Sequence, residues 1–257
     1  MRRVRTSKIG RLATISIENP PMNLLDEHLL NDLYSAASQA ERSPDVAALV
    51  ISGGSGAYFS AGIAWDSIKN SESFVRKSQA LSSLILSFPK PVIAFVNGSA
   101  LGAGLELALL ADFRLAREGC SHGVPETRYG YPSVFGGPLI LEQLVGVTAA
   151  RRVFVLGEMF SSADAVTVGL MDAVVSETAM GQELLGWVQR VTNNSDLTQL
   201  LRQVSVGPDI LRHSYELEHS ALRKMATKTD YLRSLSELAR FRESVRGGAS
   251  NLESGRV

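Results

Sequence analysis

The sequence predicts an α/β fold, on three observations. Continuous apolar segments at residues 46–52 and 92–97 are typical of strands that are buried on both faces. Residues 26–42 and 73–88 have the spacing of apolar side chains that indicates amphipathic helices. The order strand, glycine-rich turn, Ala-Gly and helix occurs twice, which indicates a weak internal repeat of βα or ββα units.

Each predicted element has a local signal. The turn residues of "NPPMN" end a first strand, an acidic start marks the first helix, and Pro89 and Pro91 end the second helix. From Gly137 onward, the pattern is mostly helical. The expected elements up to that point are strands at 11–18, 46–52, 92–97 and 112–117 and helices at 26–42, 73–88 and 104–110.

Composition excludes several classes of function. The chain has 257 residues and a formal net charge of zero, so nothing indicates a nucleic-acid partner or an anionic membrane surface. The single cysteine, Cys120, excludes an internal disulfide and suits a reducing compartment. No apolar run of signal-peptide type follows Arg2, Arg3 and Arg5, which we interpret as a solvated end. We therefore expect a cytoplasmic enzyme-sized protein.

The segment 97–116, "NGSALGAGLELALLADFRLA", carries one carboxylate, Glu106, among apolar residues and glycines. A membrane span needs roughly 20 apolar residues, and Asn97 and Glu106 interrupt this one. A dinucleotide-binding turn is disfavoured because Leu107 stands where a third glycine belongs, and Glu106 would repel a pyrophosphate. The remaining interpretation is a catalytic acid on a tight turn, with a pKa raised by burial.

The backbone around Glu106 suits the stabilisation of negative charge. Gly102 and Gly104 allow a sharp turn and close approach of a ligand. The N–H of Ala103 then lies at a helix start, where it can form half of an oxyanion hole. The loop "FSAGI" offers the N–H of Ile63 as the second half. The alternative, that both are only tight strand-to-helix turns, stays open on glycine spacing alone.

Several segments together resemble the enoyl-CoA hydratase/isomerase family, the crotonase superfamily. They are "YFSAGIAWDSI", "VIAFVNGSALGAGLELALLADFRLA", "VPETRYGYPSVFGG" and "ADAVTVGLMDAVV", in order over roughly residues 12–175. The resemblance implies a crotonase-like spiral of ββα units over 1–194. It also implies a C-terminal helical trimerisation region over 195–257, ending in a mobile tail, and assembly as a homotrimer or a dimer of trimers.

The resemblance also implies the site residues. The two oxyanion amides fall on Ile63 and Ala103, and the two catalytic glutamates fall on Glu106 and Glu126. Asp112 corresponds to an aspartate that we interpret as structural. The substrate is then a coenzyme A or acyl-carrier thioester, with no cofactor and no metal. The segment "ENPPMNLLDE" is similar to the family's first acyl-CoA-binding turn, and the expected substrate-binding residues are Met22, Leu24, Ala61, Ala64, Trp65, Gly102, Tyr131 and Phe135.

Two carboxylates favour hydration of a trans-2-enoyl thioester. Hydration adds water at Cβ and a proton at Cα, and the negative charge passes to the thioester oxygen. We assign Glu126 as the proton donor to Cα and Glu106 as the group that orients or deprotonates the water. Isomerisation of an enoyl-CoA or hydrolysis of an acyl-CoA on the same oxyanion hole are the alternatives nearest in chemistry.

The sequence departs from the family pattern at three places. Ala64 replaces an aspartate, and Trp65 replaces a leucine, in a region that shapes the acyl-CoA pocket. Ser133 replaces a glycine of the turn that closes the site around the catalytic water, and that turn is one residue longer. Near the C-terminus, Ser244 takes the place of a basic residue, and Arg246 or another arginine is the candidate to replace that charge. Tyr131, Phe135 and Trp65 make the expected pocket aromatic, unless their rings pack in the core.

Three rival interpretations remain. Ser99 and His122 are spaced as in a Clp-type serine peptidase, but no third triad member suggests itself. A non-catalytic binding protein of the same fold is the second rival, and the presence of both glutamates argues against it. The third is a metal site in "HSYELEH" (His213, Glu216 and His219), for which a solvated helix is the better account.

Overall fold

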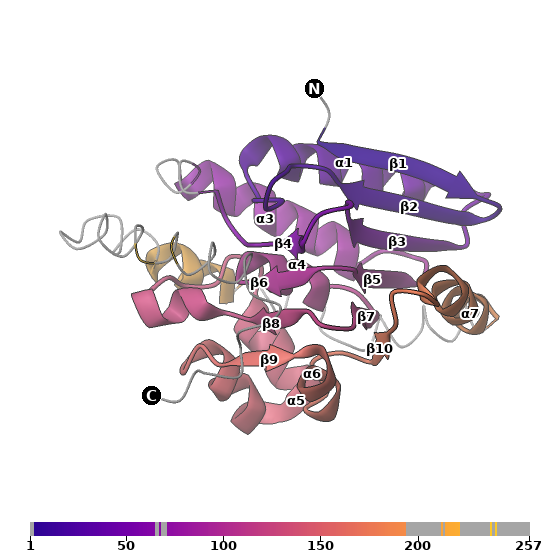
Figure 1. Cartoon of the computed structure of the whole chain (residues 1–257). Coiled ribbons are helices and arrows are strands. Elements are labelled where there is room, and N and C mark those ends of the chain that lie inside the picture. The colour runs from indigo at the N-terminus through magenta and orange to yellow at the C-terminus, as the bar shows by residue number, and fades with distance from the viewer. Residues whose placement is uncertain are drawn as a thin grey trace.

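The computed structural model describes residues 3–64, 67, 71–193, 212, 214–221, 237 and 240. Two sheets and the helices around them form its layers (Figure 1). The larger layer is a six-stranded sheet made, in spatial order, of β1 (Val4–Ile9), β2 (Leu12–Ile17), β3 (Ala48–Gly53), β5 (Val92–Val96), β7 (Phe113–Arg117) and β10 (Ala173–Val175). Within it, β1 pairs antiparallel with β2, and all other neighbours run parallel.

The second sheet is small and carries the site. It consists, in spatial order, of β4 (Tyr58–Ser60), β6 (Ser99–Leu101), β8 (Ser121–Gly123) and β9 (Met159–Ser161). The first three strands run parallel, and β9 pairs antiparallel with β8. Three residues are too few for a periodic pattern, so the sequence did not predict these strands.

The helices pack around the two sheets. They are α1 (Glu27–Arg42), α3 (Ser71–Leu86), α4 (Ala103–Leu109), the 3₁₀ helix η1 (Pro125–Tyr129), α5 (Gly137–Phe154), α6 (Ser162–Thr167) and α7 (Met180–Thr192). In Figure 1, successive units stack from the N-terminal strands at the top to α5, α6 and β9 at the bottom, as expected for a spiral. Asp26 caps α1, because its carboxylate accepts a hydrogen bond from the N–H of Leu29 at 2.9 Å.

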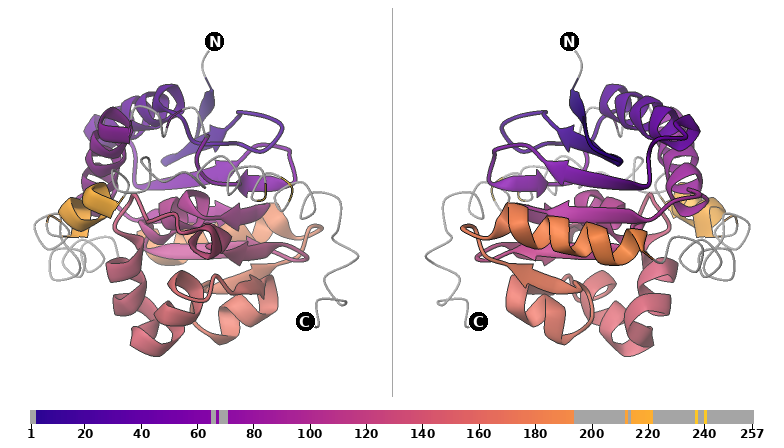
Figure 2. Two further views of the ribbon diagram at one scale, coloured as in Figure 1. Left: turned by 90° about the vertical axis from the view of Figure 1, so that its left-hand side faces the viewer. Right: turned by 90° about the vertical axis from the view of Figure 1, so that its right-hand side faces the viewer.

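The strands of the larger sheet are buried on both faces, as their apolar runs predict. Alternate residues of β3 point in opposite directions: Leu49 and Ile51 join the main core with α1 and α3. Ala48 and Val50 join a second core cluster, against which Trp187 of α7 packs. Figure 2 shows α7 lying along the sheet on the side away from α1. This two-sided cover holds the strand ends of the sheet in place.

Some predicted elements need correction. The N-terminus is not merely a solvated end, because 4–9 form β1, whose polar side chains are exposed while its backbone pairs with β2. The described part of the chain after Gly137 is mostly helical, as predicted, and also supplies the short strands β9 and β10. Glu126 lies on η1. Most of 195–257 lies outside the described residues.

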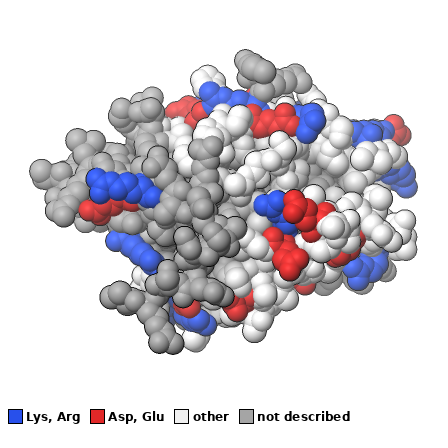
Figure 3. Space-filling view, in the orientation of Figure 1, with Lys and Arg blue, Asp and Glu red and all other residues white. Residues whose placement is uncertain are grey.

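The surface and the helices fit the composition. On the face drawn in Figure 3, the described cationic and anionic side chains lie near one another rather than in a patch of one sign. This distribution agrees with the formal net charge of zero. Among the helices of the described residues, none has the length and apolar character needed to span a bilayer.

Candidate active site

Three neighbouring strand ends bring the predicted catalytic groups together. Ser60 on β4 is in register with Ala100 on β6, and Leu101 on β6 is in register with Gly123 on β8. Ile63 and Ala103 each lie three residues beyond the first register pair, and Glu126 lies three residues beyond Gly123. Because carboxyl ends of parallel strands leave a sheet at one edge, these groups converge there, where ligands bind in α/β sheets.

Two glycines allow the turn into α4. Gly102 has a φ of +52°, and a Cβ built on it would overlap the carboxylate of Glu126. A Cβ on Gly104 would overlap the backbone carbonyl of Ser60. Glycine at both positions therefore brings α4 against β4 and η1. The N–H of Ala103, in the first turn of α4, has no intrahelical acceptor and is available to an oxyanion.

The other predicted oxyanion amide lies on a segment that runs beside residues 22–25. Leu25 donates to the carbonyl of Gly62 at 2.8 Å and accepts from the N–H of Ala64 at 2.7 Å. In such a parallel bridge, the N–H of the intervening Ile63 points to the opposite side. That side is the one on which β4 adjoins β6.

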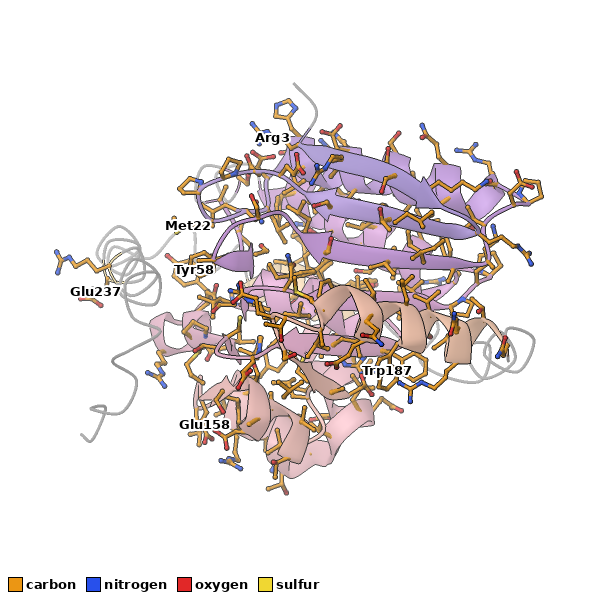
Figure 4. All side chains as sticks on the ribbon, turned by 45° about the vertical axis from the view of Figure 1, so that its right-hand side comes forward. Arg3, Met22, Tyr58, Glu158, Trp187 and Glu237 are labelled. Carbon is orange, nitrogen blue, oxygen red and sulfur yellow. The ribbon has the colours of Figure 1, made fainter. Side chains whose placement is uncertain are left out.

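Four predicted substrate-binding residues lie on these two adjacent segments. Ala61 donates its N–H to the carbonyl of Met22 at 3.0 Å, and Met22 and Leu24 pack on a small cluster that contains Ala61. Figure 4 shows Met22 and Tyr58, another member of this cluster, at the same end of the molecule. Ala64 follows on the same segment, whereas Trp65 lies outside the described residues.

Asn23, which the sequence analysis did not single out, holds this segment in place. Its side-chain amide donates to the carbonyl of Tyr58 at 3.0 Å and to that of Phe59 at 3.2 Å. Its φ of +50° lies in the region that asparagine tolerates better than most residues. The turn residues around it were the only signal in the sequence that could have found it.

Glu106 is buried and firmly held. Its Oε2 accepts from the Ser133 hydroxyl at 2.5 Å and from the N–H groups of Val134 and Phe135 at 3.1 and 3.0 Å. Burial and, to a smaller extent, the charge of Glu126 raise the pKa of Glu106 to about 7, against the lowering effect of these three donors. The sequence prediction of a raised pKa is therefore confirmed, with a buried carboxyl group poised to titrate near neutrality.

Glu126 is the second buried carboxyl group of this edge, with 7% of its surface exposed. Its carboxylate covers Gly102, directly before the N–H of Ala103. The turn that carries it is fixed by Thr127, whose hydroxyl donates to the carbonyl of Val124 at 2.9 Å. Since the charge of Glu126 acts on Glu106, the two carboxyl groups belong to one site.

The loop 131–137 covers this site with aromatic and small residues. Tyr131 is buried at 5% exposure, and its N–H donates to the carbonyl of Glu126 at 3.1 Å. The ring of Phe135 packs entirely within the main core, so its backbone N–H rather than its ring reaches Glu106. Gly137 packs closely on Glu106, because a Cβ there would lie 2.8 Å from the Glu106 Cγ. The part of Ser133 in holding Glu106 was not predicted.

Asp112 has the structural part that the sequence analysis gave it. Its carboxylate accepts from the N–H of Val92 at 2.7 Å, and its own N–H donates to the carbonyl of Val92 at 2.9 Å. The residue thus ties the end of α4 to the start of β5. It lies at the opposite end of β5 from the glycine turns.

The serine-peptidase arrangement is not formed. The His122 Nε2 lies 3.1 Å from the hydroxyl of Ser162, while the hydroxyl of Ser99 accepts from the N–H of Ser121. The Ser162 hydroxyl donates to the carbonyl of Arg117 at 2.6 Å, so His122 is the donor in its contact with Ser162. Burial lowers the pKa of His122 to about 3, and the ring is a neutral core group.

The segment "HSYELEH" also differs from the prediction. Residues 214–221 are helical, and Tyr215 and Glu218 are buried at 7% and 6% exposure, so this is not a fully solvated helix. His213 lies outside the described residues. Over the described ranges, no group of three or more His, Cys, Asp or Glu side chains is arranged to hold a metal ion.

Comparison with known proteins identifies the family. The model of the enoyl-CoA hydratase/isomerase family matches residues 8–245. A probable enoyl-CoA hydratase of Bacillus subtilis is 36% identical over 65% of this chain and 67% of its own length. A crotonyl-CoA hydratase of Syntrophomonas wolfei is 33% identical over 78% of this chain and 79% of its own length.

A solved structure agrees in fold. The human mitochondrial delta3-delta2-enoyl-CoA isomerase superposes with a TM-score of 0.85 at 23% identity, over 94% of this chain and 99% of that one. The fold and the family model agree. The chain is a crotonase-fold protein and belongs to the enoyl-CoA hydratase/isomerase family.

Proposed function

We propose that this chain is an enoyl-CoA hydratase, a hydro-lyase that adds water reversibly and syn to a trans-2-enoyl thioester. The observation that carries the proposal is the pair of buried carboxyl groups, Glu106 and Glu126, at the start of α4. The two relatives at 36% and 33% identity, whose names specify hydratases, support the same activity. A single carboxyl group would suffice to shuttle a proton between two carbons, whereas hydration has two protons to handle.

The proposed steps use the groups at the strand ends. The thioester carbonyl accepts hydrogen bonds from the N–H groups of Ile63 and Ala103, which stabilise the enolate as it forms. The oxygen of water bonds to Cβ while one of its protons passes to ionised Glu106. Protonated Glu126 gives its proton to Cα, so hydroxyl and hydrogen are added in total. A proton then returns from Glu106 to Glu126 through solvent, and the cycle closes without a cofactor.

The environment of Glu106 supports its assignment as the group that accepts the proton of water. A base works best when its pKa lies near the working pH, and burial raises that of Glu106 to about 7. Three donors hold Oε2. We therefore propose that the water binds to Oε1 of Glu106.

The test is the loss of enoyl-thioester absorbance with a panel of trans-2-enoyl-CoAs, for the wild type, Glu106→Gln and Glu126→Gln. Each amide keeps the shape but cannot exchange the proton, so we expect kcat to fall about 10²- to 10⁴-fold in both variants. Glu142→Gln, an exposed substitution on α5, is the control.

Other outcomes would replace this proposal. Turnover of trans-3-enoyl-CoA without hydration would identify an isomerase, and release of free coenzyme A would identify a hydrolase. Binding of acyl-CoA without turnover would identify a non-catalytic member of the family. Unchanged hydration in either glutamate variant would exclude that glutamate from the mechanism.

The remaining parts of the proposal concern carrier, assembly and location. We take coenzyme A as the carrier. The proposed substrate-binding residues are Met22, Leu24, Ala61, Ala64, Trp65, Gly102 and Tyr131, with Phe135 contributing its backbone because its ring is buried in the main core. We propose a catalytic core at 1–194, with 195–257 as the helical region of a homotrimer or dimer of trimers. Exposed apolar side chains near the end of α5, Val155 and Leu156, support assembly. A single cysteine supports a cytoplasmic location.

A further inference from the structure

The proposed function leaves one buried carboxyl group of the described residues unused, that of Glu218. It lies in the helical segment 214–221, and 6% of its surface is exposed. Its neighbours Glu216 and Leu217 are exposed, whereas Tyr215 is buried and belongs to the main core. Because residues three apart lie on one helix face, Tyr215 and Glu218 point together into the molecule.

Glu218 binds the same loop that holds Glu106. The N–H of Gly136 donates to the Glu218 Oε2 at 3.2 Å, while the N–H groups of Val134 and Phe135 donate to the Glu106 Oε2. Three consecutive backbone N–H groups are therefore divided between two carboxyl groups. The loop therefore lies between Glu106 and Glu218 and is hydrogen-bonded to both.

Ser133 connects the two carboxyl groups further. Its single hydroxyl hydrogen is donated to Glu106 at 2.5 Å, and its oxygen accepts from the N–H of Gly137 at 3.1 Å. Ser133 also interacts with the carboxyl group of Glu218. The other oxygen of Glu218, Oε1, is buried and has no hydrogen-bond partner among the described residues. A buried charge without enough donors is costly, so this environment favours the neutral acid.

The charges around Glu218 favour the same protonation state. Burial and, to a smaller extent, the charge of Glu106 raise the pKa of Glu218 to about 8, against the lowering effect of Ser133, Gly136 and Ser214. The groups that face it are Glu106 from α4, the neutral donors of the loop, and Tyr215 from its own helix. None of the ion pairs in the described part of the chain includes Glu218.

We propose that Glu218 is a positioning residue of the catalytic centre. As a neutral carboxylic acid, it holds the loop 133–137 over Glu106, so that Glu106 alone carries the negative charge that draws a proton from water. When Glu218 loses its proton, two anions face the loop, their repulsion displaces the loop from Glu106, and hydration slows. This inference rests on the proposed function, in which Glu106 accepts a proton from the water.

The first test is the pH dependence of kcat/KM between pH 6 and 9.5 for the wild type, Glu218→Gln and Glu216→Gln. Glutamine resembles the neutral acid at every pH, and Glu216 is the exposed neighbour on the same helix. We expect kcat/KM of the wild type and of Glu216→Gln to fall by about tenfold per pH unit above pH 8. The kcat/KM of Glu218→Gln divided by that of the wild type should rise by the same factor per pH unit above pH 8.

Parallel pH profiles for Glu218→Gln and the wild type would overturn the proposal, since a merely structural residue would lower activity without changing the profile. A ratio that falls with increasing pH would overturn it as well, because the ionised form would then be the active one. Glu218→Ala, which removes the contact with Gly136, should lower kcat at every pH.

The second test does not depend on activity. Melting temperature is measured without substrate from pH 5 to 9 for the same proteins. Folded Glu218 keeps a proton that the unfolded chain releases, so it stabilises the protein most below pH 4.5 and loses that effect as pH rises through about 8. Glu218→Gln should show a smaller decline than Glu216→Gln; equal declines would overturn the proposal. If the melting temperature of Glu218→Gln declined less but the protein had no hydratase activity, Glu218 would still be a neutral acid in the folded protein, and the proposed function would be rejected.

Discussion

At the scale of the residue, opposing environments set the proton affinity of Glu106. Removal from water favours the neutral acid, whereas the hydroxyl of Ser133 and two backbone N–H groups favour the carboxylate. The pKa of about 7 is the outcome of both. A residue that replaces a family glycine thus acts directly on a proposed catalytic group, which the turn sequence alone did not indicate.

Replacing Ser133 with alanine should shift the pH at which activity appears. Hydration requires ionised Glu106, so kcat/KM rises with pH through the pKa of that group. A hydrogen bond to a charged group contributes about 1.5–3 kcal/mol, and one pKa unit corresponds to about 1.4 kcal/mol. We therefore expect the acidic limb of Ser133→Ala to move up by at least about one pH unit, measured from kcat/KM between pH 5 and 9.

A matched control for this shift is Ser78→Ala. Ser78 is equally buried, and its hydroxyl donates to the carbonyl of Phe74 within α3, away from the carboxyl pair. The acidic limb of the kcat/KM profile of Ser78→Ala should coincide with that of the wild type. If Ser133→Ala left the limb in place, the hydroxyl would not be setting the proton affinity of Glu106.

At the scale of the element, three short parallel strands place the site. Strands β4, β6 and β8 contribute few hydrogen bonds each, yet their register puts Ile63 and Ala103 at equivalent positions beyond one edge and Glu126 one position further along. Glycine turns then let α4 begin immediately. The positions of these groups are therefore set by rigid backbone rather than by long side chains.

Gly102→Ala tests this arrangement. The substitution places an L residue at φ of +52° and a Cβ within the carboxylate of Glu126, so it displaces both the N–H of Ala103 and Glu126. Loss of one oxyanion donor lowers kcat about 10²- to 10³-fold, and we expect at least that effect. The measurement is kcat with a short trans-2-enoyl-CoA, together with the melting temperature.

Gly130→Ala is the control for backbone strain. Gly130 has a φ of +78°, but a Cβ there would meet no atom within 4 Å. We expect it to lower stability by about 1–2 kcal/mol, as for a left-handed L residue, with little effect on kcat. Similar losses of kcat in both variants would indicate that strain, rather than overlap with Glu126, limits the reaction.

At the scale of the whole molecule, buried titratable groups link stability to pH. His122 is fully buried, and its pKa is lowered to about 3. The unfolded chain takes up a proton near pH 6.5 that the folded chain refuses until about pH 3. Stability from His122 is therefore present above pH 6.5 and is lost as pH falls, by up to about 1.4 kcal/mol per pH unit.

We expect His122→Asn to reduce this acid dependence. Melting temperature measured between pH 4 and 7 should fall less steeply toward acid in the variant than in the wild type, whatever its absolute stability. His28→Asn, a substitution of an exposed histidine on α1, should keep the wild-type slope. An unchanged slope in His122→Asn would mean that the ring is protonated in the folded protein at higher pH than its burial implies.

Long elements of the fold were predictable because their signals are local. The apolar runs of β3 and β5 and the capped, amphipathic α1 need no partner to be recognised. Strand β1 was not predicted because most of its side chains are exposed, so it has no apolar pattern. It is an edge strand that forms by backbone pairing with β2. The three-residue strands were missed because they exist only through pairing.

The sequence by itself predicted the α/β class, a buried carboxyl group at Glu106 and the glycine turns, because these depend on residue type and short spacing, and its resemblance to the family added Glu126. Only the tertiary structure decided that Ser133 holds Glu106, that Asn23 fastens the segment beside Ile63, and that Glu218 lies inside. These contacts join residues far apart in the chain, and which face of a helix is covered depends on what packs against it.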